Sequence, residues 1–493
     1  MENRTLMQTK RFILLIVLLL LLLVSCDNTT QTVISLNGAF EWINAWGGIS
    51  FDTIVDSIFD ADNNIYIAGI FNGEVDFDPG SNKHTVSTVD NDADAFVVKF
   101  SGSGKFKWVS TFNVTPTGIS VDSEKNVYLI GHFNKNVDFN PNKTPAAIID
   151  PTGKVDGFLI KMNSKGKFEQ VDTFGGTTAT SEVKPTGIVI NSINEICICG
   201  NFIDQLQFNN LLIGNSNTEC FLLKYSATMQ RQWETSWGSS ESDTCNAMSI
   251  STLDDILLTG NYKNTVDFDP GVGVVNKTSF GTDGYVLKLD TNKQFVWVNT
   301  WGAAGGTVTP ASIVTDDSIN SYICGSYQKD VAFDSANPSV IESSANDSDD
   351  CFYLIIDFNG AYLHHNVWGG VSSDSAVDLF VDDSGNIFIG GKFQHTVDFD
   401  PSVGVADRTS NGFEDAFLCE FDCNNDFVGV VSFGSQYNDQ IQSVLRTGND
   451  DRYVFGSFQR TVDFDTTDKV KEISSIGHVD CYYMRICTEI FKQ

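Results

Sequence analysis

Val75-Asp76-Phe77-Asp78-Pro79 is one of seven related tracts in this chain of 493 residues. The others are Val137-Asp138-Phe139-Asn140-Pro141, Leu206-Gln207-Phe208-Asn209, Val266-Asp267-Phe268-Asp269-Pro270, Val331-Ala332-Phe333-Asp334, Val397-Asp398-Phe399-Asp400-Pro401 and Val462-Asp463-Phe464-Asp465. Successive tracts begin 60 to 69 residues apart. Such periodic self-similarity is typical of a repeat architecture, so we expect seven copies of one unit of roughly 65 residues. The repeat overrides the three domains or so that length alone suggests.

Each repeat unit is predicted to hold four antiparallel strands. In the first copy the strands are expected over residues 54–59, 65–71, 95–100 and 105–112, with turns over 60–64 and 101–104. Alternating apolar residues bounded by Gly, Asn, Asp and Ser favour strands joined by hairpins. Four antiparallel strands per repeat make one blade of a β-propeller.

The two ends of the chain distinguish a closed propeller from an open solenoid. The fourth-strand pattern, usually two aromatic residues four positions apart, occurs at Trp42/Trp46, Trp108/Phe112, Gln170/Phe174, Trp233/Trp237, Trp297/Trp301, His364/Trp368 and Gly429/Phe433. Its first copy precedes the first blade, whereas the chain stops near the third strand of the seventh blade, residues 480–487. An N-terminal strand over 39–46 therefore closes the last blade and leaves no open sheet edge. We predict an all-β, seven-bladed propeller over residues 37–493.

All eight tryptophans belong to this fourth-strand pattern. A spacing of four along a strand puts both members of a pair on one face. An aromatic ladder of this kind can bind sugars, but a position shared by the whole repeat is more often structural. We favour packing between blades.

The N-terminal segment is predicted to be a signal peptide over residues 1–25. Arg4, Lys10 and Arg11 precede an apolar run over 12–24, which is shorter than the roughly 20 residues of a membrane-spanning helix. Leu23-Val24-Ser25-Cys26 resembles the bacterial lipobox, which implies lipidation at Cys26 and a short tether over 26–36. An ordinary secretory signal is the alternative, and either one exports the protein. Several acyl chains on one cysteine suffice for stable anchoring.

The repeat resembles a known bacterial family. Trp46-Gly47-Gly48, Asp62-Asn63-Asn64-Ile65-Tyr66, Gly69, the tract at 75–80 and Asp94-Ala95-Phe96-Val97 look like the SBBP-type beta-propeller repeat. The resemblance covers residues 36–487. It implies the propeller fold and a location in the cell envelope, and the family has no agreed biochemical activity.

Four tracts carry two aspartates that are two residues apart. These residues are Asp76 and Asp78, Asp267 and Asp269, Asp398 and Asp400, and Asp463 and Asp465. In an extended segment both carboxylates face one way, and with nearby carbonyl groups they are candidate Ca²⁺ ligands. The alternative is turn chemistry, in which the carboxylates accept local backbone N–H groups. Three copies lack one or both of the two acids, which favours the alternative.

The sequence offers no constellation of catalytic residues. The innermost strands align Asp56, Gly118, Gly187, Ala247, Ser312, Asp378 and Ser443 at one position of the central channel. Only two of these are charged, and the six histidines occupy unrelated positions in the repeat. No Gly-rich phosphate loop or nucleophile elbow is present. An enzyme hypothesis therefore rests on the analogy with propellers that act as lyases or glycosidases.

Ten cysteines remain after Cys26. Cys199 and Cys324 stand at one second-strand position, and Cys220 and Cys351 stand at one third-strand position. Their joint occurrence in blades three and five indicates cross-strand disulfides Cys199–Cys220 and Cys324–Cys351, which suit an oxidising envelope. The alternative, equally weighted, is that both positions take small buried residues, since free cysteine behaves as a small hydrophobe.

Charge and motifs together define the expected function. The chain has a net charge of −32, and removal of residues 1–25 changes it to −34, which disfavours nucleic acid as a partner. We expect a monomeric, membrane-anchored cell-envelope lipoprotein that acts as a non-catalytic binding scaffold for a protein or glycan, with no cofactor other than the candidate calcium. The alternative is an envelope enzyme acting on carbohydrate, a glycosidase or a lyase, which predicts two or more carboxylates converging in one pocket.

Overall fold

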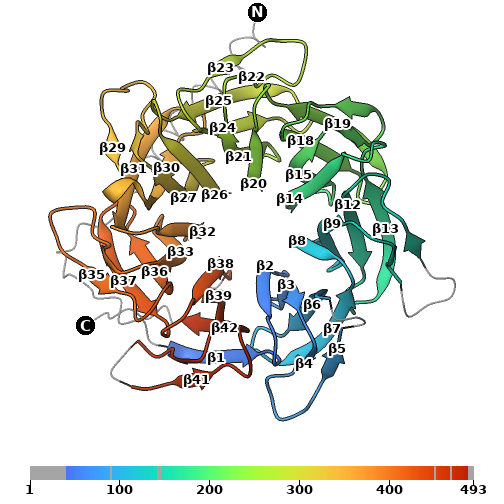
Figure 1. Cartoon of the computed structure of the whole chain (residues 1–493), viewed down its shortest axis with the longest axis vertical. Helices are drawn as coiled ribbons and strands as arrows, with labels where there is room; N and C mark the ends of the chain where they lie inside the picture. Colours follow the sequence, from blue (N-terminus) through green and yellow to red (C-terminus); the bar gives the residue numbers. More distant parts are fainter. Residues whose placement is uncertain (1–39, 89–91, 141–146, 449–450, 467–468, 487–493) are drawn as a thin grey trace, which may run out of the picture. The chain divides into compact units, whose positions relative to one another are not determined.

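The protein forms a closed ring of seven antiparallel blades in the computed structural model (Figure 1). The structure describes residues 40–88, 92–140, 147–448, 451–466 and 469–486. The predicted all-β, seven-bladed propeller with four-stranded blades is confirmed. The predicted signal peptide over 1–25, Cys26 and the tether over 26–36 lie outside the described residues. Across the described ranges, no helix is long and apolar enough to cross a membrane.

Each blade is built from four long strands, which run from the innermost to the outermost strand in chain order in blades one to six. Blade one has β2 (Thr53–Phe59), β3 (Ile65–Phe71), β6 (Asp94–Phe100) and β7 (Phe106–Phe112), and blade two has β8 (Thr115–Val121), β9 (Val127–Phe133), β12 (Asp156–Met162) and β13 (Phe168–Phe174). Blade three has β14 (Glu182–Ile190), β15 (Ile196–Ile203), β18 (Glu219–Tyr225) and β19 (Arg231–Trp237), and blade four has β20 (Thr244–Ile250), β21 (Ile256–Tyr262), β24 (Asp283–Leu289) and β25 (Phe295–Trp301). Blade five has β26 (Thr307–Thr315), β27 (Ser321–Gln328), β30 (Asp349–Ile356) and β31 (Tyr362–Gly370), and blade six has β32 (Ser375–Val381), β33 (Ile387–Phe393), β36 (Asp415–Phe421) and β37 (Phe427–Phe433).

The seventh blade joins the two ends of the chain. It contains β38 (Gln440–Arg446), β39 (Arg452–Phe458) and β42 (Asp480–Ile486), and its outermost strand is β1 (Phe40–Trp46). β1 lies antiparallel to β42, with Ile43 opposite Met484 and Trp46 opposite Cys481. The predicted closure by an N-terminal strand is confirmed.

Each tract forms one strand of a small two-stranded hairpin, which the sequence did not predict. The hairpins are β4 (Glu74–Asp76) with β5 (Thr85–Ser87), β10 (Val137–Asp138) with β11 (Ile148–Ile149), β16 (Gln205–Gln207) with β17 (Leu211–Ile213), β22 (Thr265–Asp267) with β23 (Asn276–Thr278), β28 (Asp330–Val331) with β29 (Glu342–Ser343), β34 (Thr396–Asp398) with β35 (Asp407–Thr409) and β40 (Thr461–Asp463) with β41 (Glu472–Ser474). Val75 and Phe77 are buried, and Phe71 stacks edge-on against Phe77. The alternation of apolar and acidic residues thus anchors the tract by its Val and Phe.

The hydrophobic core lies between neighbouring blades. One cluster, for example, joins Tyr66 and Ala68 of blade one to Leu129 and Phe158 of blade two. All seven innermost strands also carry a register shift at one equivalent place, such as the shift between Ile54 and Asp56. A bulge bends a strand and strengthens its twist, which suits strands that line the axis of a ring.

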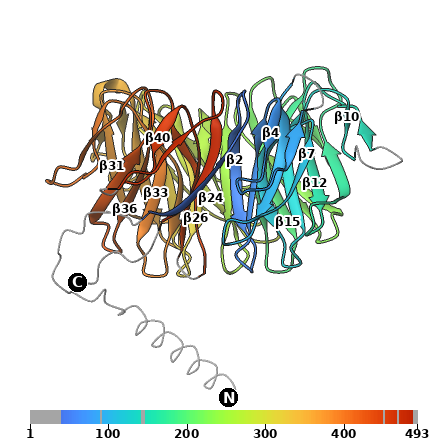
Figure 2. The same cartoon turned by 90° about the horizontal axis from the view of Figure 1, so that it is seen from below.

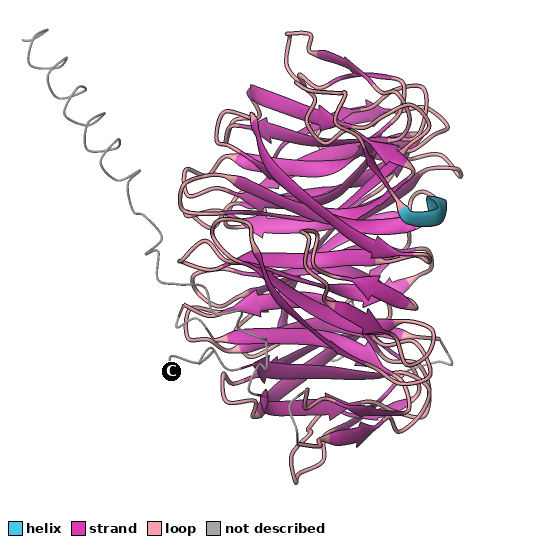
Figure 3. Cartoon of the chain, turned by 90° about the vertical axis from the view of Figure 1, so that its left-hand side faces the viewer, coloured by secondary structure: helices cyan, strands magenta, loops and turns pink. Residues whose placement is uncertain are grey.

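The two faces of the ring carry different kinds of connections. The insert face carries the connections between blades, such as 47–52, and the connections from the second to the third strand, such as 72–93. The hairpin face carries the tight turns, such as 60–64 and 101–105. The tract hairpins β4, β10 and β40 lie toward the same side of the disc (Figure 2). Apart from the short 3-10 helix η1 (Ala345–Asp347), the described chain is strands and loops (Figure 3).

Candidate functional site

The paired tract aspartates hold turns together. Asp76 accepts the backbone N–H groups of Asp78 at 3.2 Å and His84 at 2.8 Å, and Asp78 accepts that of Gly80 at 2.9 Å. The same two acceptor roles recur in the tracts of Asp267 with Asp269 and Asp398 with Asp400, and Asp463 repeats the first role toward Asp465 and Lys471. These are the hydrogen bonds of the turn interpretation.

The tract aspartates do not gather into a multidentate metal site in the described ranges, where no group of three or more His, Cys, Asp or Glu side chains has the geometry to hold a metal ion. Ca²⁺ takes six to eight oxygen ligands, and a single aspartate pair supplies few of them. The calcium hypothesis stays a prediction, and a thermal measurement with and without the ion tests it below.

The two predicted disulfides are wrong. Cys199, Cys220, Cys324 and Cys351 are buried free thiols. The strand register explains this result, because Cys199 lies opposite Leu222 and Cys220 lies opposite Asn201. The two cysteines are diagonal neighbours, and diagonal positions across an antiparallel pair lie about 7–8 Å apart, beyond the usual reach of a disulfide.

The same offset separates Cys324 from Cys351. Cys423, for which the sequence showed no trusted pairing, is disulfide-bonded in the structure. It lies in the turn between β36 and β37. The other eight described cysteines are free.

The tryptophans pack blades together, as expected for the structural alternative. The second aromatic residue of every fourth-strand pair is buried: Trp46, Phe112, Phe174, Trp237, Trp301, Trp368 and Phe433. The first residue bridges to the following blade in several copies. Trp108 donates its indole N–H to the carbonyl oxygen of Ser164, and Trp297 donates to that of Phe358. An exposed ladder for sugar binding is not formed by these residues.

Asp56 and Asp378, the two acidic residues at the channel-lining position of the innermost strands, link neighbouring blades. Asp56 accepts the backbone N–H of Ile119 in blade two at 2.8 Å, and Asp378 accepts that of Val444 in blade seven at 2.9 Å. Burial raises the pKa of Asp56 to about 7, and the charge of Asp378 adds to this rise. Because both carboxylates are engaged by structural donors, we assign them to the architecture of the ring.

An acidic residue begins the third strand in six blades and occupies the second position of that strand in blade five. This set, whose role the sequence did not reveal, comprises Asp94, Asp156, Glu219, Asp283, Asp350, Asp415 and Asp480. In six junctions the acid lies against the glycine that directly follows the second aromatic residue of the fourth-strand pair: Gly47, Gly175, Gly238, Gly302, Gly369 and Gly434. An added Cβ at any of these glycines would overlap the acidic side chain or crowd it closely. The glycine after the aromatic residue is therefore a packing requirement.

In several blades, a second buried aspartate stabilises the connection from the preceding blade through hydrogen bonds. Asp52 accepts the backbone N–H of Gly48 at 2.7 Å and that of Asn72 at 3.2 Å, and Asp374 makes the equivalent pair of bonds in blade six. Burial raises the pKa of both aspartates to about 7, although their backbone donors oppose the rise. Asp243 and Asp439 hold the corresponding places in blades four and seven.

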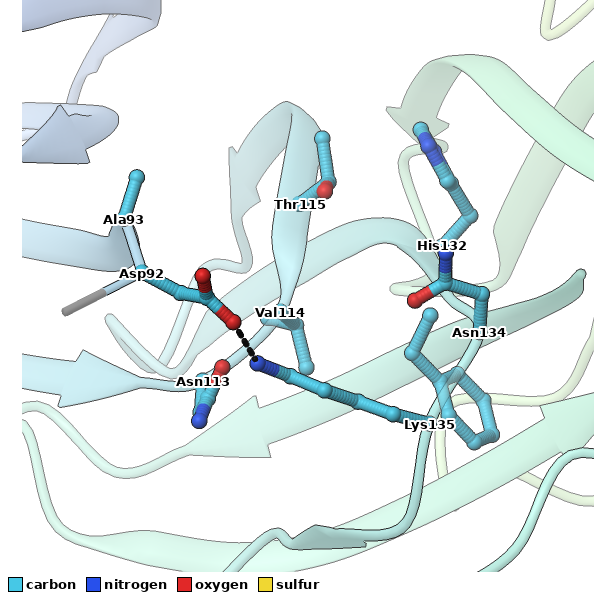
Figure 4. A pocket seen from close by; sticks show the side chains of 9 residues that line it. Asp92, Ala93, Asn113, Val114, Thr115, His132, Asn134 and Lys135 are labelled. Carbon is cyan, nitrogen blue, oxygen red and sulfur yellow. Dashed lines mark hydrogen bonds and ion pairs between the residues drawn. The ribbon is translucent and has the colours of Figure 1, made fainter. Parts of the chain in front are cut away.

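The junction between blades one and two lacks this arrangement and opens into a pocket. Its connection has only Asn113 and Val114, whereas the connection before blade one spans 47–52. The resulting pocket has a volume of about 180 Å³ and is lined by Asp92, Ala93, Asn113, Val114, Thr115, His132, Phe133, Asn134 and Lys135 (Figure 4). In the sequence, the one sign of this pocket is the absence of Gly-Gly after Phe112.

The pocket is polar, and its described residues carry one carboxylate. Lys135 and Asp92 form an ion pair of 2.9 Å across it (Figure 4). The ring of His132 is half-buried, and burial lowers its pKa, which keeps the imidazole neutral near pH 7. Asn113, Thr115 and Asn134 add hydrogen-bonding groups. This set can bind a polar ligand, whereas the paired carboxylates of a glycosidase are not brought together in it.

Comparison with known proteins finds distant similarities and assigns no family to this chain. No family model matches the chain. An uncharacterised WD repeat-containing protein of Acanthamoeba polyphaga mimivirus is 26% identical over 239 residues, which cover 42% of this chain and 17% of that protein. The chain thus spans less than a fifth of the length of this relative.

Among solved structures, the Neurospora crassa Pan2 WD40 domain matches with a TM-score of 0.43 and 9% identity over 90% of this chain and 95% of that domain. Virginiamycin B lyase from Staphylococcus aureus matches with a TM-score of 0.39 and 7% identity over 90% of this chain and 99% of the lyase. This chain is a seven-bladed β-propeller whose structural neighbours include a WD40 domain and a lyase.

Proposed function

We propose that this protein is a bacterial cell-envelope lipoprotein, anchored through Cys26, that acts as a monomeric, non-catalytic binding scaffold for a protein or a glycan. The apolar run over 12–24 and the lipobox-like Leu23-Val24-Ser25-Cys26 support export and lipidation. The closed ring supports the scaffold, since function in such folds lies in sites on the loops. The acidic composition disfavours nucleic acid as the ligand.

The observation that carries this proposal is the place where the chain enters the ring. Phe40 begins β1 opposite Ile486, and Ile486 lies opposite Arg452 at the start of β39, directly after a turn of the hairpin face. An anchor that precedes Phe40 therefore joins the ring at the hairpin face. The insert face, with its pocket and its variable connections, points away from that point of attachment.

The tether is short enough to keep the ring near the bilayer. Residues 27–39 separate Cys26 from β1, and a fully extended chain of this length reaches about 45 Å. Since the chain enters the ring at the hairpin face, this short reach favours an arrangement in which the insert face is displayed outward.

The scaffold has more support than the carbohydrate enzyme. Among the described residues, the pocket between blades one and two holds one carboxylate, that of Asp92, which is paired with Lys135. The channel acids Asp56 and Asp378 bridge blades through backbone donors. A purely structural protein is a third reading, which predicts no pocket, so the pocket of about 180 Å³ favours binding.

Fractionation of cells tests the anchoring. The natural chain is expected in the membrane fraction, where it incorporates an alkyne-labelled fatty acid, and Cys26→Ala is expected to lose the label and leave that fraction. Cys197→Ala is the matched control, because it removes a free cysteine from the ring and leaves both the lipobox and the disulfide of Cys423 intact. Retention of Cys26→Ala in the membrane with its label would refute the lipoprotein proposal.

A further inference from the structure

On the insert face, the junctions between blades differ in the apolar side chains that they expose. At six junctions, the segment before the third strand is hydrogen-bonded to the connection between that blade and the next. In blade six, for example, Asp439 donates its backbone N–H to the carbonyl oxygen of Glu414 at 2.8 Å. These segments carry exposed apolar side chains only in part of the ring. The copies differ here, although their strands are alike.

Four consecutive junctions, from blade four round to blade one, carry large exposed apolar side chains, which we call the apolar arc. The arc consists of Phe280, Val371, Phe413, Tyr437, Ile476, Ile49 and Phe51. Phe280, Phe413 and Ile49 are 75%, 70% and 75% exposed.

Neighbouring members of the arc lie close together. Ile476 and Ile49 belong to adjacent segments, because His478 donates its backbone N–H to the carbonyl oxygen of Ser50 and a Cβ at Gly477 would strike Ile49. In the same way, a Cβ at Gly412 beside Phe413 would strike Gln436 beside Tyr437.

The other three junctions are polar. Asn215 and Asn217 donate their side-chain amides to the carbonyl oxygens of Ser239 and Ser240 in blade three. The corresponding segment of blade two carries Thr152 and Lys154, and the junction between blades one and two carries the Asp92–Lys135 ion pair. The apolar residues of the arc are therefore not a requirement of the propeller, which closes equally well with amides at the same places.

We propose that the apolar arc is the docking surface for a protein partner whose contact region combines aromatic or aliphatic side chains with a basic rim. This inference rests on the proposed scaffold function and names its ligand class. Exposed apolar patches, such as those of Ile476 with Ile49 and of Phe413 with Tyr437, mark interaction sites. The net charge of −32 steers basic partners toward the chain and repels acidic ones.

Two other occupants fit the structure less well. A second copy of this chain carries the same charge of −32, so an arc-to-arc dimer meets repulsion between the two copies. In the proposed lipoprotein, the anchor precedes Phe40, which begins β1 at the hairpin face, whereas the arc lies on the insert face. A protein partner is the occupant that satisfies both the charge and the geometry.

Binding of designed peptides to the full lipoprotein in a neutral-lipid nanodisc tests this surface. The probes are a peptide of alternating Lys and Phe, a matched Glu and Phe peptide, and a matched Lys and Ser peptide. The arc variant carries Phe51→Ser, Phe280→Ser, Phe413→Ser and Ile476→Ser. The control variant carries Ile193→Ser, Leu253→Ser, Phe358→Ser and Leu363→Ser, which change four exposed apolar side chains at or next to turns of the hairpin face.

The natural chain and the control variant are expected to bind the Lys and Phe peptide at least 10-fold more tightly than either matched peptide, and the arc variant is expected to lose this preference. Equal loss in both variants, equal binding of the Glu and Phe peptide, capture of neutral vesicles through the arc, or arc-dependent dimerisation would each overturn the proposal. Anchoring is measured separately by fractionation, so a failure of the lipoprotein proposal is distinguishable from a failure of the arc.

Discussion

The carboxylate of Asp480 occupies the space that a side chain at Gly47 would need, since an ideal Cβ on Gly47 would lie 2.5 Å from Asp480 Oδ1. Gly47 follows the closing strand β1, and Asp480 begins β42, so this contact joins the two ends of the chain. The same contact between a glycine and an acidic side chain recurs at five other junctions of the ring.

Gly47→Ala is expected to lower the free energy of unfolding by about 1–3 kcal/mol, because the added methyl group overpacks a buried contact. Urea denaturation followed by tryptophan fluorescence measures the change. Gly448→Ala is the control, since nothing lies within 4 Å of a Cβ at that position. We expect its stability to be unchanged or raised by up to about 1 kcal/mol. Equal losses in the two variants would contradict the packing account.

Stability is expected to fall as the pH rises from about 4 to 7. Burial raises the pKa of Asp52 and Asp374 to about 7 and that of Asp350 and Asp415 to about 6, whereas an unfolded aspartate titrates near 3.9. The folded protein thus binds more protons than the unfolded chain in this window. Each such group lowers the free energy of unfolding by on the order of 1 kcal/mol per pH unit.

Urea midpoints across this pH range measure the linkage. Asp374→Asn removes one of these titrating groups and is expected to flatten the pH dependence by up to one proton. The exposed Asp407→Asn is the matched control and is expected to leave the slope unchanged. A stability that rises from pH 4 to 7 would show that these carboxylates are ionised in the folded protein.

The tract aspartates provide a third test. If they act only in turns, millimolar Ca²⁺ and EDTA leave the melting temperature unchanged. Asp398→Ala then lowers the free energy of unfolding by about 1–3 kcal/mol, because the N–H groups of Asp400 and Ala406 lose their acceptor. A melting temperature that rises with Ca²⁺, and no longer does so in Asp398→Ala, would establish a calcium site instead.

Thiol chemistry tests the corrected cysteine assignment. The eight free, buried cysteines are expected to resist a maleimide in the native protein and to react fully in urea without reductant, whereas Cys423 reacts only after reduction. Peptide mapping of the unreduced protein measures the pattern. A disulfide-linked peptide pair containing Cys199 and Cys220 would restore the prediction that the strand register contradicts.

The ring itself was predictable, because seven tracts and a displaced fourth strand count the blades without any coordinates. The pairing of the cysteines could not be predicted, for a physical reason. The partner of Cys199 depends on strand register, and Leu222 rather than Cys220 lies opposite it. A shift of two residues keeps both side chains on the same face, so the hydrophobic pattern does not reveal it.

The pocket and the apolar arc escaped for a different reason. Asn113 and Val114 form the shortest of the connections between blades, but a short connection reveals a pocket only once its neighbours are placed. Phe280 and Phe413 look like core residues in sequence, and only their exposure of 75% and 70% marks them as surface. We expect function where the seven repeats differ, and such differences leave no periodic pattern in the sequence.

The most direct test of the account is the orientation of the ring on a membrane. A fluorescent probe is attached to Leu253→Cys, in a turn of the hairpin face, or to Val371→Cys, in a connection of the insert face, both of which are well exposed. In proteoliposomes that carry a headgroup quencher, the probe at position 253 is expected to be quenched more strongly than the probe at position 371. Equal quenching, or stronger quenching at position 371, would contradict the outward display of the insert face.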